Sequence, residues 1–157
     1  MKNIYILFLL GVVVTTLSCE DGNKNYTEEF DSVYYYLKEG VNEFDFYSVN
    51  SAKVQTITVG RGGHGLNGVS TINLVPFTQA EMDEYNATID GDYKLLAPEY
   101  YDMPATVAFE DGVEYRNVDV VFKGNMSELA KTGEYMLPIR LEADNGTVND
   151  NKNIIYF

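Results

Sequence analysis

The chain has 157 residues, with 24 acidic and 11 basic side chains and a formal net charge of -13 at pH 7. Such an acidic surface repels phosphate backbones and anionic head groups, which argues against nucleic-acid binding. The single cysteine, Cys19, excludes a disulfide within the chain, and the length suits one domain with one core.

Residues 1–18 have the layout of an export signal. Lys2 precedes an apolar run from Ile4 to Val14, and small polar residues then lead to Cys19. The run is too short to span a hydrocarbon core of about 30 Å, which needs about 20 helical residues. Residues 16–19 resemble a bacterial lipobox with its leucine displaced, so we predict a lipoprotein signal peptide and lipidation of Cys19. A buried N-terminal helix is the alternative interpretation.

Residues 19–30 are predicted to form a lipidated acidic tether. Glu20 and Asp21 directly follow the cysteine, and this pair resembles the surface-export signal of Bacteroidota lipoproteins. The alternative is a solvated linker, because a flexible tether needs only polarity. We therefore expect an outer-membrane, lipid-anchored protein exposed at the cell surface, with a folded domain over residues 31–157.

The first strand is predicted over Ser32–Leu37. Tyrosine and valine suit a half-buried pleated surface, and alternation places Tyr34 and Tyr36 on one face and Tyr35 on the other. One of these faces is expected to be core. Residues 31–33 also resemble a Bacteroidota O-glycosylation sequence, with Ser32 as the candidate acceptor.

Two further predicted strands, Glu43–Val49 and Lys53–Val59, lead to a glycine-rich segment, Gly60–Gly65. We expect this segment to be a flexible loop. It matches neither the GxxxxGK[ST] phosphate loop nor a GxGxxG motif between a strand and a helix. Its His64 is the only histidine, so no His-rich metal site or Ser-His-Asp triad can form here without distant partners.

The clearest helix signal follows a predicted strand at Val69–Phe77. Thr78 and Glu81 have the spacing of a capping box, which predicts a helix from about Gln79 to Asn86. The acidic residues of its first turns suit the positive end of the helix dipole, so they need no catalytic explanation.

A hairpin is predicted around Asp111-Gly112, a dipeptide typical of tight turns. It would pair Thr106–Glu110 with Val113–Phe122. The apolar phase slips by one residue along the second arm, which predicts a bulge near Arg116-Asn117.

The last third of the chain predicts a short helix and two strands. Asn125 can cap a helix that runs to about Lys131. Tyr135–Leu141 alternates strictly between apolar and other side chains, which puts four apolar residues on one face. Pro138 lacks an amide hydrogen, so this strand should lie at an edge or pair on one side there. With a final strand at Asn153–Phe157, the sequence predicts an all-β fold with one or two short helices.

Candidate binding residues are few. Tyr100 and Tyr101 lie in a loop bracketed by prolines, where exposed rings could stack on sugars. Packing of these rings against the core is the alternative, because tyrosine is intermediate in burial, and the absence of tryptophan weakens the idea of a sugar platform.

The acidic residues single out no catalytic site. A hydrolase needs two carboxylates held about 5 to 10 Å apart across a cleft, and the sequence does not identify such a pair. Calcium binding at Asp90/Asp92 or Asp144/Asp150 is conceivable, but the spacing is not that of an EF-hand. The sequence thus predicts no catalytic residue, no metal site and no cofactor.

Several motifs together resemble a known family. They are TITVGRGG, the LVPF that precedes the helix, YKLLAPEYYDMP, the EDG turn and YMLPIRLE. The family is the domain of unknown function common at the N-termini of Bacteroides surface lipoproteins, including some endo-β-N-acetylglucosaminidases of the chitinase-like class. The resemblance covers nearly all of the chain after the signal and implies an immunoglobulin-like β-sandwich.

The resemblance also implies that the domain is not an enzyme. In the enzymes of this family the catalytic residues lie in a separate barrel, and a barrel takes about 250 residues. We therefore expect an accessory or glycan-binding module in a polysaccharide or glycoprotein-glycan acquisition system, with a glycan or another surface lipoprotein as partner. The alternative is a structural or adhesin-like spacer that pairs an open edge strand with a partner protein.

Overall fold

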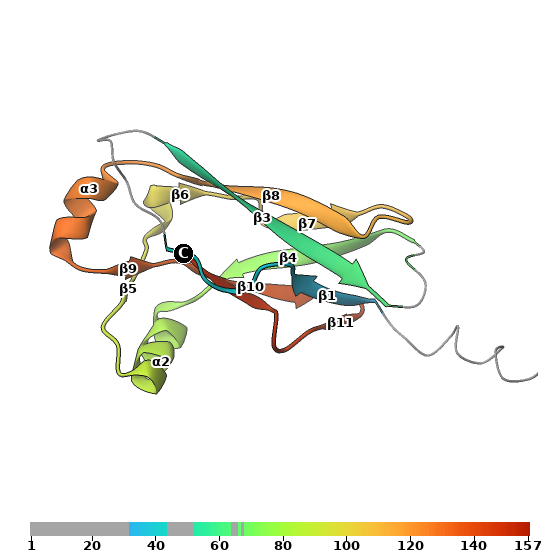
Figure 1. The fold of residues 1–157 in the computed structure, drawn as a ribbon, viewed down its shortest axis with the longest axis horizontal. Coiled ribbons are helices and arrows are strands. Elements are labelled where there is room, and N and C mark those ends of the chain that lie inside the picture. Colours follow the sequence, from blue (N-terminus) through green and yellow to red (C-terminus); the bar gives the residue numbers. More distant parts are fainter. Residues whose placement is uncertain (1–31, 44–51, 64–65, 67) are drawn as a thin grey trace, which may run out of the picture.

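The computed structural model describes residues 32–43, 52–63, 66 and 68–157 (Figure 1). Outside these residues lie the signal peptide, Cys19, the tether, most of the predicted strand Glu43–Val49 and His64, so what the sequence predicts for them stays a prediction. Within the described residues two five-stranded sheets pack face to face around one core.

Each sheet combines strands from distant parts of the chain. In spatial order, sheet A contains β11 (Thr147–Val148), β1 (Val33–Tyr36), β3 (Lys53–Gly62), β8 (Tyr115–Phe122) and β6 (Tyr101–Asp102). Sheet B contains β2 (Gly40–Val41), β12 (Ile154–Tyr156), β10 (Pro138–Ala143), β4 (Ser70–Pro76) and β7 (Thr106–Phe109). A separate parallel pair joins β5 (Lys94–Leu95) to β9 (Tyr135–Met136).

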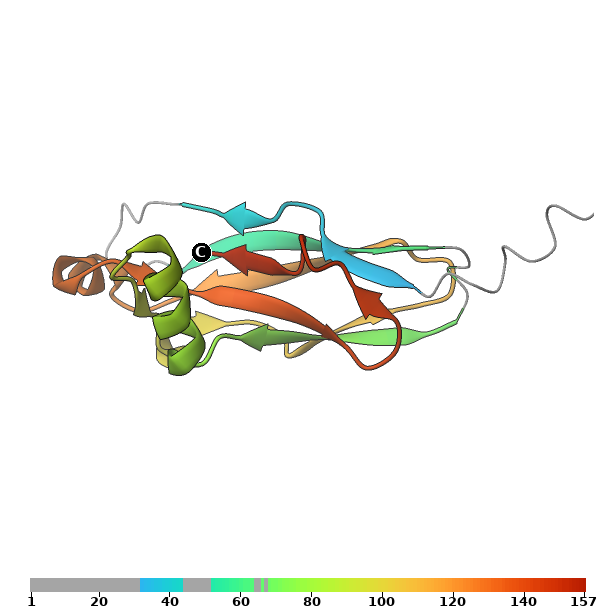
Figure 2. The same cartoon turned by 90° about the horizontal axis from the view of Figure 1, so that it is seen from below.

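Helices are short and lie at one end of the sandwich. They are α2 (Gln79–Ile89), α3 (Met126–Leu129) and the 3-10 turns η1 (Pro98–Tyr100) and η2 (Ala130–Thr132). Figure 2 shows α2 in front of sheet B, where Tyr85 stacks on Tyr156 of β12 with ring centroids 4.9 Å apart. The predicted all-β fold, an immunoglobulin-like β-sandwich with short helices, is confirmed.

The core is built by the alternation that the sequence predicted. Tyr34 and Tyr36 point inward from β1, and Tyr35 lies on the other face and is only partly buried. The inward side chains of both sheets form one cluster, worth about 1.5 to 3 kcal/mol for each large residue buried. Its other members from the long strands are Ile57, Val59, Ile72, Leu74, Val107, Phe109, Val118, Val120, Phe122, Leu137, Ile139, Leu141 and Ile155.

The predicted strand Tyr135–Leu141 is divided in two. β9 pairs with β5, and β10 then begins at Pro138 and pairs with both β4 and β12. The prediction of an edge position is therefore wrong, because β10 is central in sheet B. The other half of the prediction is confirmed, because at Pro138 the strand ladder runs on one side only: Pro138 pairs with Tyr156 of β12, and the β4 ladder begins at Ile139 with Pro76. On the β4 side Pro138 contributes only its carbonyl, which accepts from Phe77 N at 3.0 Å, so no N–H is needed there.

The Asp111-Gly112 turn is an arch between the two sheets, and the predicted hairpin is wrong. Its first arm, β7, pairs with β4 in sheet B, whereas its second arm, β8, pairs with β3 and β6 in sheet A. Both arms carry apolar side chains that are buried in the core from opposite sides. A hairpin would instead place both sets on one face of a single sheet.

No bulge interrupts β8. The pairing of β3 with β8 is continuous from Lys53 with Phe122 to Gly60 with Tyr115, so the bulge predicted near Arg116-Asn117 is wrong. The apparent change of phase arises because Tyr115 belongs to the outer face of the strand, where it is 49% exposed.

The predicted glycine loop begins later than expected, because β3 continues through Gly62. Gly60 has no side chain to collide with the Tyr35 ring of β1, and a Cβ there would come within 2.6 Å of Tyr35 Cζ. Between the two glycines, Arg61 points inward and is 2% exposed. The segment Gly60–Gly65, which the composition predicted to be a flexible loop, is therefore partly the end of a core strand.

Arg61 is buried with all of its donors in hydrogen bonds. Its Nε donates to Val113 O at 3.1 Å, and its Nη2 donates to Leu66 O at 2.6 Å and to Glu110 O at 2.9 Å. Its Nη1 donates to Gly68 O at 3.0 Å and to Ser70 Oγ at 3.3 Å. Five donors in a fixed plane thus join the end of β3, the segment before β4 and the arch before β8.

We predict that Arg61→Met lowers the free energy of unfolding by about 3 to 5 kcal/mol, because it leaves the buried carbonyls of the arch unpaired. Arg61→Lys should cost less, since an ammonium keeps the charge and three donors. Arg116→Met is the control: Arg116 makes an ion pair with Glu110 at 3.4 Å and donates from Nε to Ala108 O at 3.0 Å. Both contacts are at the surface, where water can replace them, so they are worth about 1 kcal/mol each or less. Urea unfolding measures the three values, and equal losses for Arg61→Met and Arg116→Met would contradict the role given to Arg61.

Candidate functional site

A groove of about 510 Å³ opens at the end of the sandwich where α3 lies. Five segments and the Phe157 side chain line it. They are Val41–Glu43, Tyr93 with Leu96, Phe122, the α3–η2 residues Met126, Leu129 and Ala130, and Gly133–Met136.

The groove combines an apolar floor with polar groups. Leu96, Phe122 and Met136 are buried members of its lining. Glu43 and Glu134 are exposed and bring two carboxylates to the same groove. A lining of this kind suits a ligand that has both apolar surface and hydroxyl groups.

Asn86, at the end of α2, fixes the position of Tyr93. The Asn86 side chain donates to Tyr93 O at 2.8 Å and accepts from Tyr93 N at 3.1 Å. The turn between the two residues is closed by Asp90, whose left-handed backbone (φ 54°) lets its N–H reach Asn86 O. The place of Tyr93 in the groove therefore depends on the place of α2.

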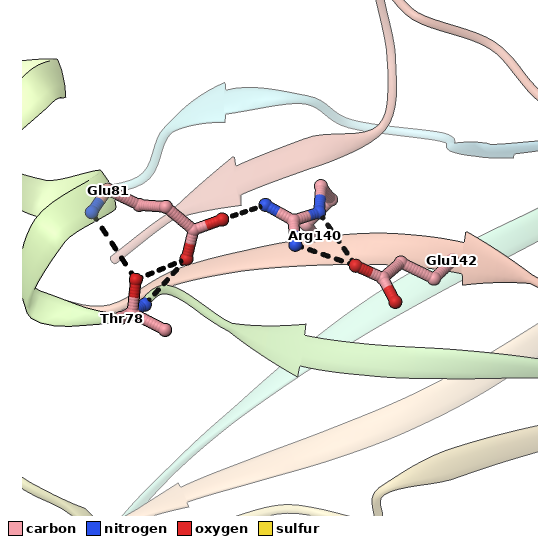
Figure 3. A network of polar contacts seen from close by, with 4 residues as sticks. All are labelled: Thr78, Glu81, Arg140 and Glu142. Atoms are coloured by element: carbon pink, nitrogen blue, oxygen red, sulfur yellow. Dashed lines mark hydrogen bonds and ion pairs between the residues drawn. The ribbon is translucent and has the colours of Figure 1, made fainter.

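A polar network anchors α2 to sheet B (Figure 3). The predicted capping box is confirmed: Thr78 N donates to Glu81 Oε2 at 2.7 Å, and Glu81 N donates to Thr78 Oγ1 at 3.3 Å. Arg140 of β10 binds Glu81 through Nη1 and donates from Nη2 to Glu142 Oε1 at 2.6 Å. Backbone donation from Thr78, followed by Arg140 and the Thr78 hydroxyl, lowers the pKa of Glu81 to about 2.

Tyr135 also lines the groove, on the strand that pairs with β5, which directly follows Tyr93. Its hydroxyl hydrogen-bonds with Thr132 Oγ1 at 2.9 Å, and Lys94 Nζ lies 5.7 Å from its ring centroid. Gly133, with φ 146°, leaves the space that the Lys94 side chain fills, since a Cβ there would lie 2.9 Å from Lys94 Nζ. The predicted Asn125 cap of the preceding helix is confirmed, because Asn125 Oδ1 accepts from Glu128 N at 3.2 Å.

Tyr100 and Tyr101 are not among the groove residues. Both are partly buried and pack against the core, and burial raises the pKa of Tyr101. Gly124 lies against the Tyr100 ring, at 3.3 Å from a Cβ position to Tyr100 Cδ1. This placement fits the packing interpretation, and glycan binding by the two rings stays a prediction.

The other candidate residues have local structural contacts. Ser32 precedes β1, is partly buried and accepts from Thr147 N through its carbonyl at 2.9 Å. Asp144 accepts from Asn73 at 3.1 Å, and Asp90 ends α2. In the described part of the chain, no three His, Cys, Asp or Glu residues gather as a metal site would require. None of the helices in that part has the length and apolar character that crossing a membrane requires.

Sequence reasoning missed the groove residues Tyr93, Glu134 and Tyr135. No local motif marks them, since Tyr93 follows a turn and Glu134 and Tyr135 follow a glycine. They meet because the β5–β9 pair joins segments about 40 residues apart. A pairing between such distant segments has no signature in a single sequence.

Comparisons with known proteins place the fold in a wider group. A protein-family model described as an N-terminal domain matches residues 20–148. No curated protein matches the sequence. Among solved structures, a candidate carbohydrate-binding protein from Bacteroides ovatus superimposes with a TM-score of 0.62 at 21% identity, over 79% of this chain and 35% of that one.

Two further crystal structures show the same fold. A protein of unknown function from Bacteroides ovatus gives a TM-score of 0.60 at 16% identity, over 78% of this chain and 42% of that one. A two-domain protein of unknown function from Bacteroides fragilis gives 0.56 at 12% identity, over 82% and 45%. The chain thus spans less than half the length of each of these three proteins.

We predict that Glu81→Gln lowers the free energy of unfolding by about 1 kcal/mol at pH 7, because the charged bond to Arg140 is lost. The folded pKa of Glu81 is lowered to about 2, so its contribution is present above its ordinary pKa of 4.5 and disappears as the pH falls toward 2. Urea unfolding of wild type and variant at pH 7 and pH 3 should show the difference shrinking in acid. Glu84→Gln, in the same helix, is the control, and a difference that does not change with pH would contradict the assignment.

Proposed function

Because the chain belongs to this family of Bacteroides N-terminal domains of unknown function, we propose that it is a non-catalytic accessory or glycan-binding module of a surface lipoprotein. The system it serves would acquire polysaccharides or glycoprotein glycans. The observation that supports this most directly is the groove, with Tyr93 and Tyr135 beside Glu43 and Glu134.

The chemistry of the groove matches a neutral glycan. Sugar rings present C–H faces that pack on aromatic rings, and hydroxyl edges that donate to carboxylates and amides. Tyr93 and Tyr135 offer the rings, and the Asn42 amide also lines the groove, with its nitrogen donating to Gly40 O at 3.0 Å. An anionic ligand would be repelled by the carboxylates and by the net charge of -13. The similarity to a candidate carbohydrate-binding protein adds support.

Glu81, which lies outside the groove, is not a candidate general acid for glycoside hydrolysis. A general acid in a glycosidase needs a carboxyl group whose pKa is raised. Glu81 has a shifted pKa, but the shift is downward, and Arg140 and Thr78 hold it in a structural network. Its charged form therefore stabilises α2.

The spacer alternative loses the two open edges that it named. It required an open edge at the Pro138 strand or at the C-terminal strand, and both β10 and β12 have neighbours on two sides. The strands at the described edges, β11, β6, β2 and β7, have two to four residues each. Edges this short give a partner strand few backbone groups to pair with. The longer open stretch among the described residues is in β8, because β6 pairs only with Val121 and Phe122.

We further propose that Cys19 anchors the protein to the outer membrane through lipid. Two or three acyl chains would make this attachment effectively permanent. Expressed in a Bacteroides host, the wild type should incorporate labelled palmitate and sediment with the outer membrane. Cys19→Ala should lose both properties, whereas wild-type protein found in the cytosol with its leader attached would contradict the proposal.

Binding to the groove can be tested with two variants. Glu134→Gln removes a charged acceptor and should weaken binding about tenfold, because such a bond is worth about 1.5 kcal/mol or more. Tyr135→Ala removes one of the two aromatic rings of the groove and should weaken glycan binding further. The matched control is Glu128→Gln, since Glu128 is exposed on α3 and lies outside the groove.

The measurement is a glycan array that covers host and plant glycans, followed by calorimetry on the glycans that bind. A blank array would contradict the glycan proposal and favour the spacer. Loss of binding in Tyr100→Ala/Tyr101→Ala, with Glu134→Gln unaffected and all variants folded, would move the site from the groove to the predicted loop. Turnover of any glycan by the purified domain would contradict the non-catalytic role.

A further inference from the structure

The outer face of sheet A has a surface that the proposed groove does not use. Strands β1, β3 and β8 lie side by side there, and α2 lies on the other side of the sandwich, at sheet B (Figures 1 and 2). We call the outward side chains of this region the tyrosine–threonine face. Its members are Tyr35, Thr56, Thr58, Tyr115, Asn117 and Asp119.

A pair of tyrosines stands at one end of the face. The Tyr35 ring spans two glycines of β3: a Cβ would lie 2.6 Å from it at Gly60 and 3.5 Å from it at Gly62. Tyr115 lies across β3 from Tyr35, since both pair with Gly60. A hydrogen bond between Tyr115 and Tyr35 helps to raise the pKa of Tyr35, so the hydroxyl stays neutral.

The stability of the fold explains why a tyrosine is present at position 35, but it does not explain the tyrosine at position 115. A tyrosine that covers a glycine of the neighbouring strand protects the backbone hydrogen bonds there, which accounts for Tyr35. Tyr115 also pairs with Gly60, but the three atoms nearest to a Cβ at Gly60 all belong to Tyr35, and Tyr115 remains 49% exposed. A large ring left half in solvent beside a second ring is available to a ligand.

Polar side chains continue the face along the same two strands. Thr58 Oγ1 donates to Asn117 Oδ1 at 2.8 Å, and Thr56 Oγ1 donates to Asp119 Oδ1 at 2.6 Å. These bonds hold the acceptors in place and do not use the Asn117 amide nitrogen or the second Asp119 oxygen. The three rungs at positions 115, 117 and 119 cover about 13 Å, because a strand rises about 3.3 Å per residue.

We propose that the tyrosine–threonine face binds an extended neutral polysaccharide that runs along β3 and β8. One sugar ring stacks on Tyr115 beside Tyr35, and the hydroxyls of the following sugars bind Asn117 and Asp119. This proposal rests on the proposed function and adds a second surface for the same class of ligand, on a different side of the domain from the groove.

Charge and polarity favour a glycan over other ligands. The six residues of the face include no lysine or arginine, and Glu114 is close enough to influence Tyr35, so a polyanion would be repelled. A protein interface has an apolar centre that excludes water, whereas the two rungs next to the tyrosines are polar. An apolar pair, Val54 with Val121, follows only beyond them, at the far end of β3 and β8. A surface of rings followed by fixed polar groups matches an alternation of C–H faces and hydroxyls.

The test is affinity electrophoresis of the whole domain in gels that contain mannan, xylan, mixed-linkage β-glucan or galactan, with polygalacturonate as the anionic comparison. Tyr115→Ala should weaken retardation by a neutral polymer about threefold to tenfold, as expected for one lost stacking contact. Tyr115→Phe should keep most of the binding, because it keeps the ring. Ile89→Ala removes another exposed apolar side chain, at the end of α2, and should have no effect.

The outcomes separate the two proposals. If Tyr115→Ala binds like wild type while Glu134→Gln binds more weakly, the proposal for the tyrosine–threonine face is wrong and the proposal for the groove stands. If Tyr115→Ala is weakened and Glu134→Gln is not, the face stands alone. If no neutral polymer retards the protein, or if only polygalacturonate does, the proposal for the tyrosine–threonine face is wrong, and the glycan array still decides the groove. If Tyr115→Ala changes the melting temperature, Asn117→Ala is tested in its place. Asn117→Ala is expected to weaken binding less than Tyr115→Ala does.

Discussion

The buried guanidinium of Arg61 is the contact on which the arrangement of the two sheets depends. Removing a charge from water costs several kcal/mol unless its donors are satisfied, and here four carbonyls and one hydroxyl receive them. These acceptors belong to the arch and to the segment before β4, so one side chain joins both sheets. The β3–β8 pairing begins next to it, at Gly60 and Tyr115. That register decides which β8 side chains enter the core and which form the tyrosine–threonine face.

Much of the fold follows from local patterns in the sequence. Alternation grouped the side chains of β1, β3, β4 and β10 by face, and the Thr78–Glu81 box marked the start of α2, because both signals depend only on neighbours in the chain. The failures came where a local signal fits two tertiary arrangements. Asp111-Gly112 suits a hairpin and an arch equally well, and the choice depends on the strands that each arm finds as partners. Likewise, Gly60 and Gly62 suggested a loop, but they provide room for the Tyr35 ring on a core strand.

The candidate sites were less predictable than the fold. The groove brings together Tyr93, Glu134 and Tyr135 through the short β5–β9 pair and the contacts of Asn86, none of which has a sequence motif. The loop tyrosines that attracted attention in the sequence, Tyr100 and Tyr101, pack against the core. Both proposed surfaces instead stand on ordered elements, with the network of Glu81 and Arg140 holding the helix that supports Tyr93. Rigid support of this kind lowers the entropy lost when a ligand binds.

The most direct test of this architecture is the hydrogen exchange of the Arg61 side chain, followed by NMR on protein labelled with ¹⁵N. We predict a resolved Arg61 Nε–H signal that exchanges slowly with water, because this group donates to Val113 O in the interior. The signal should also show contacts to protons of residues 113 and 109, since the guanidinium carbon lies 5.5 Å from the Phe109 ring centroid. An Arg61 signal that exchanges as fast as that of an exposed arginine, with no contact to the arch, would contradict this architecture.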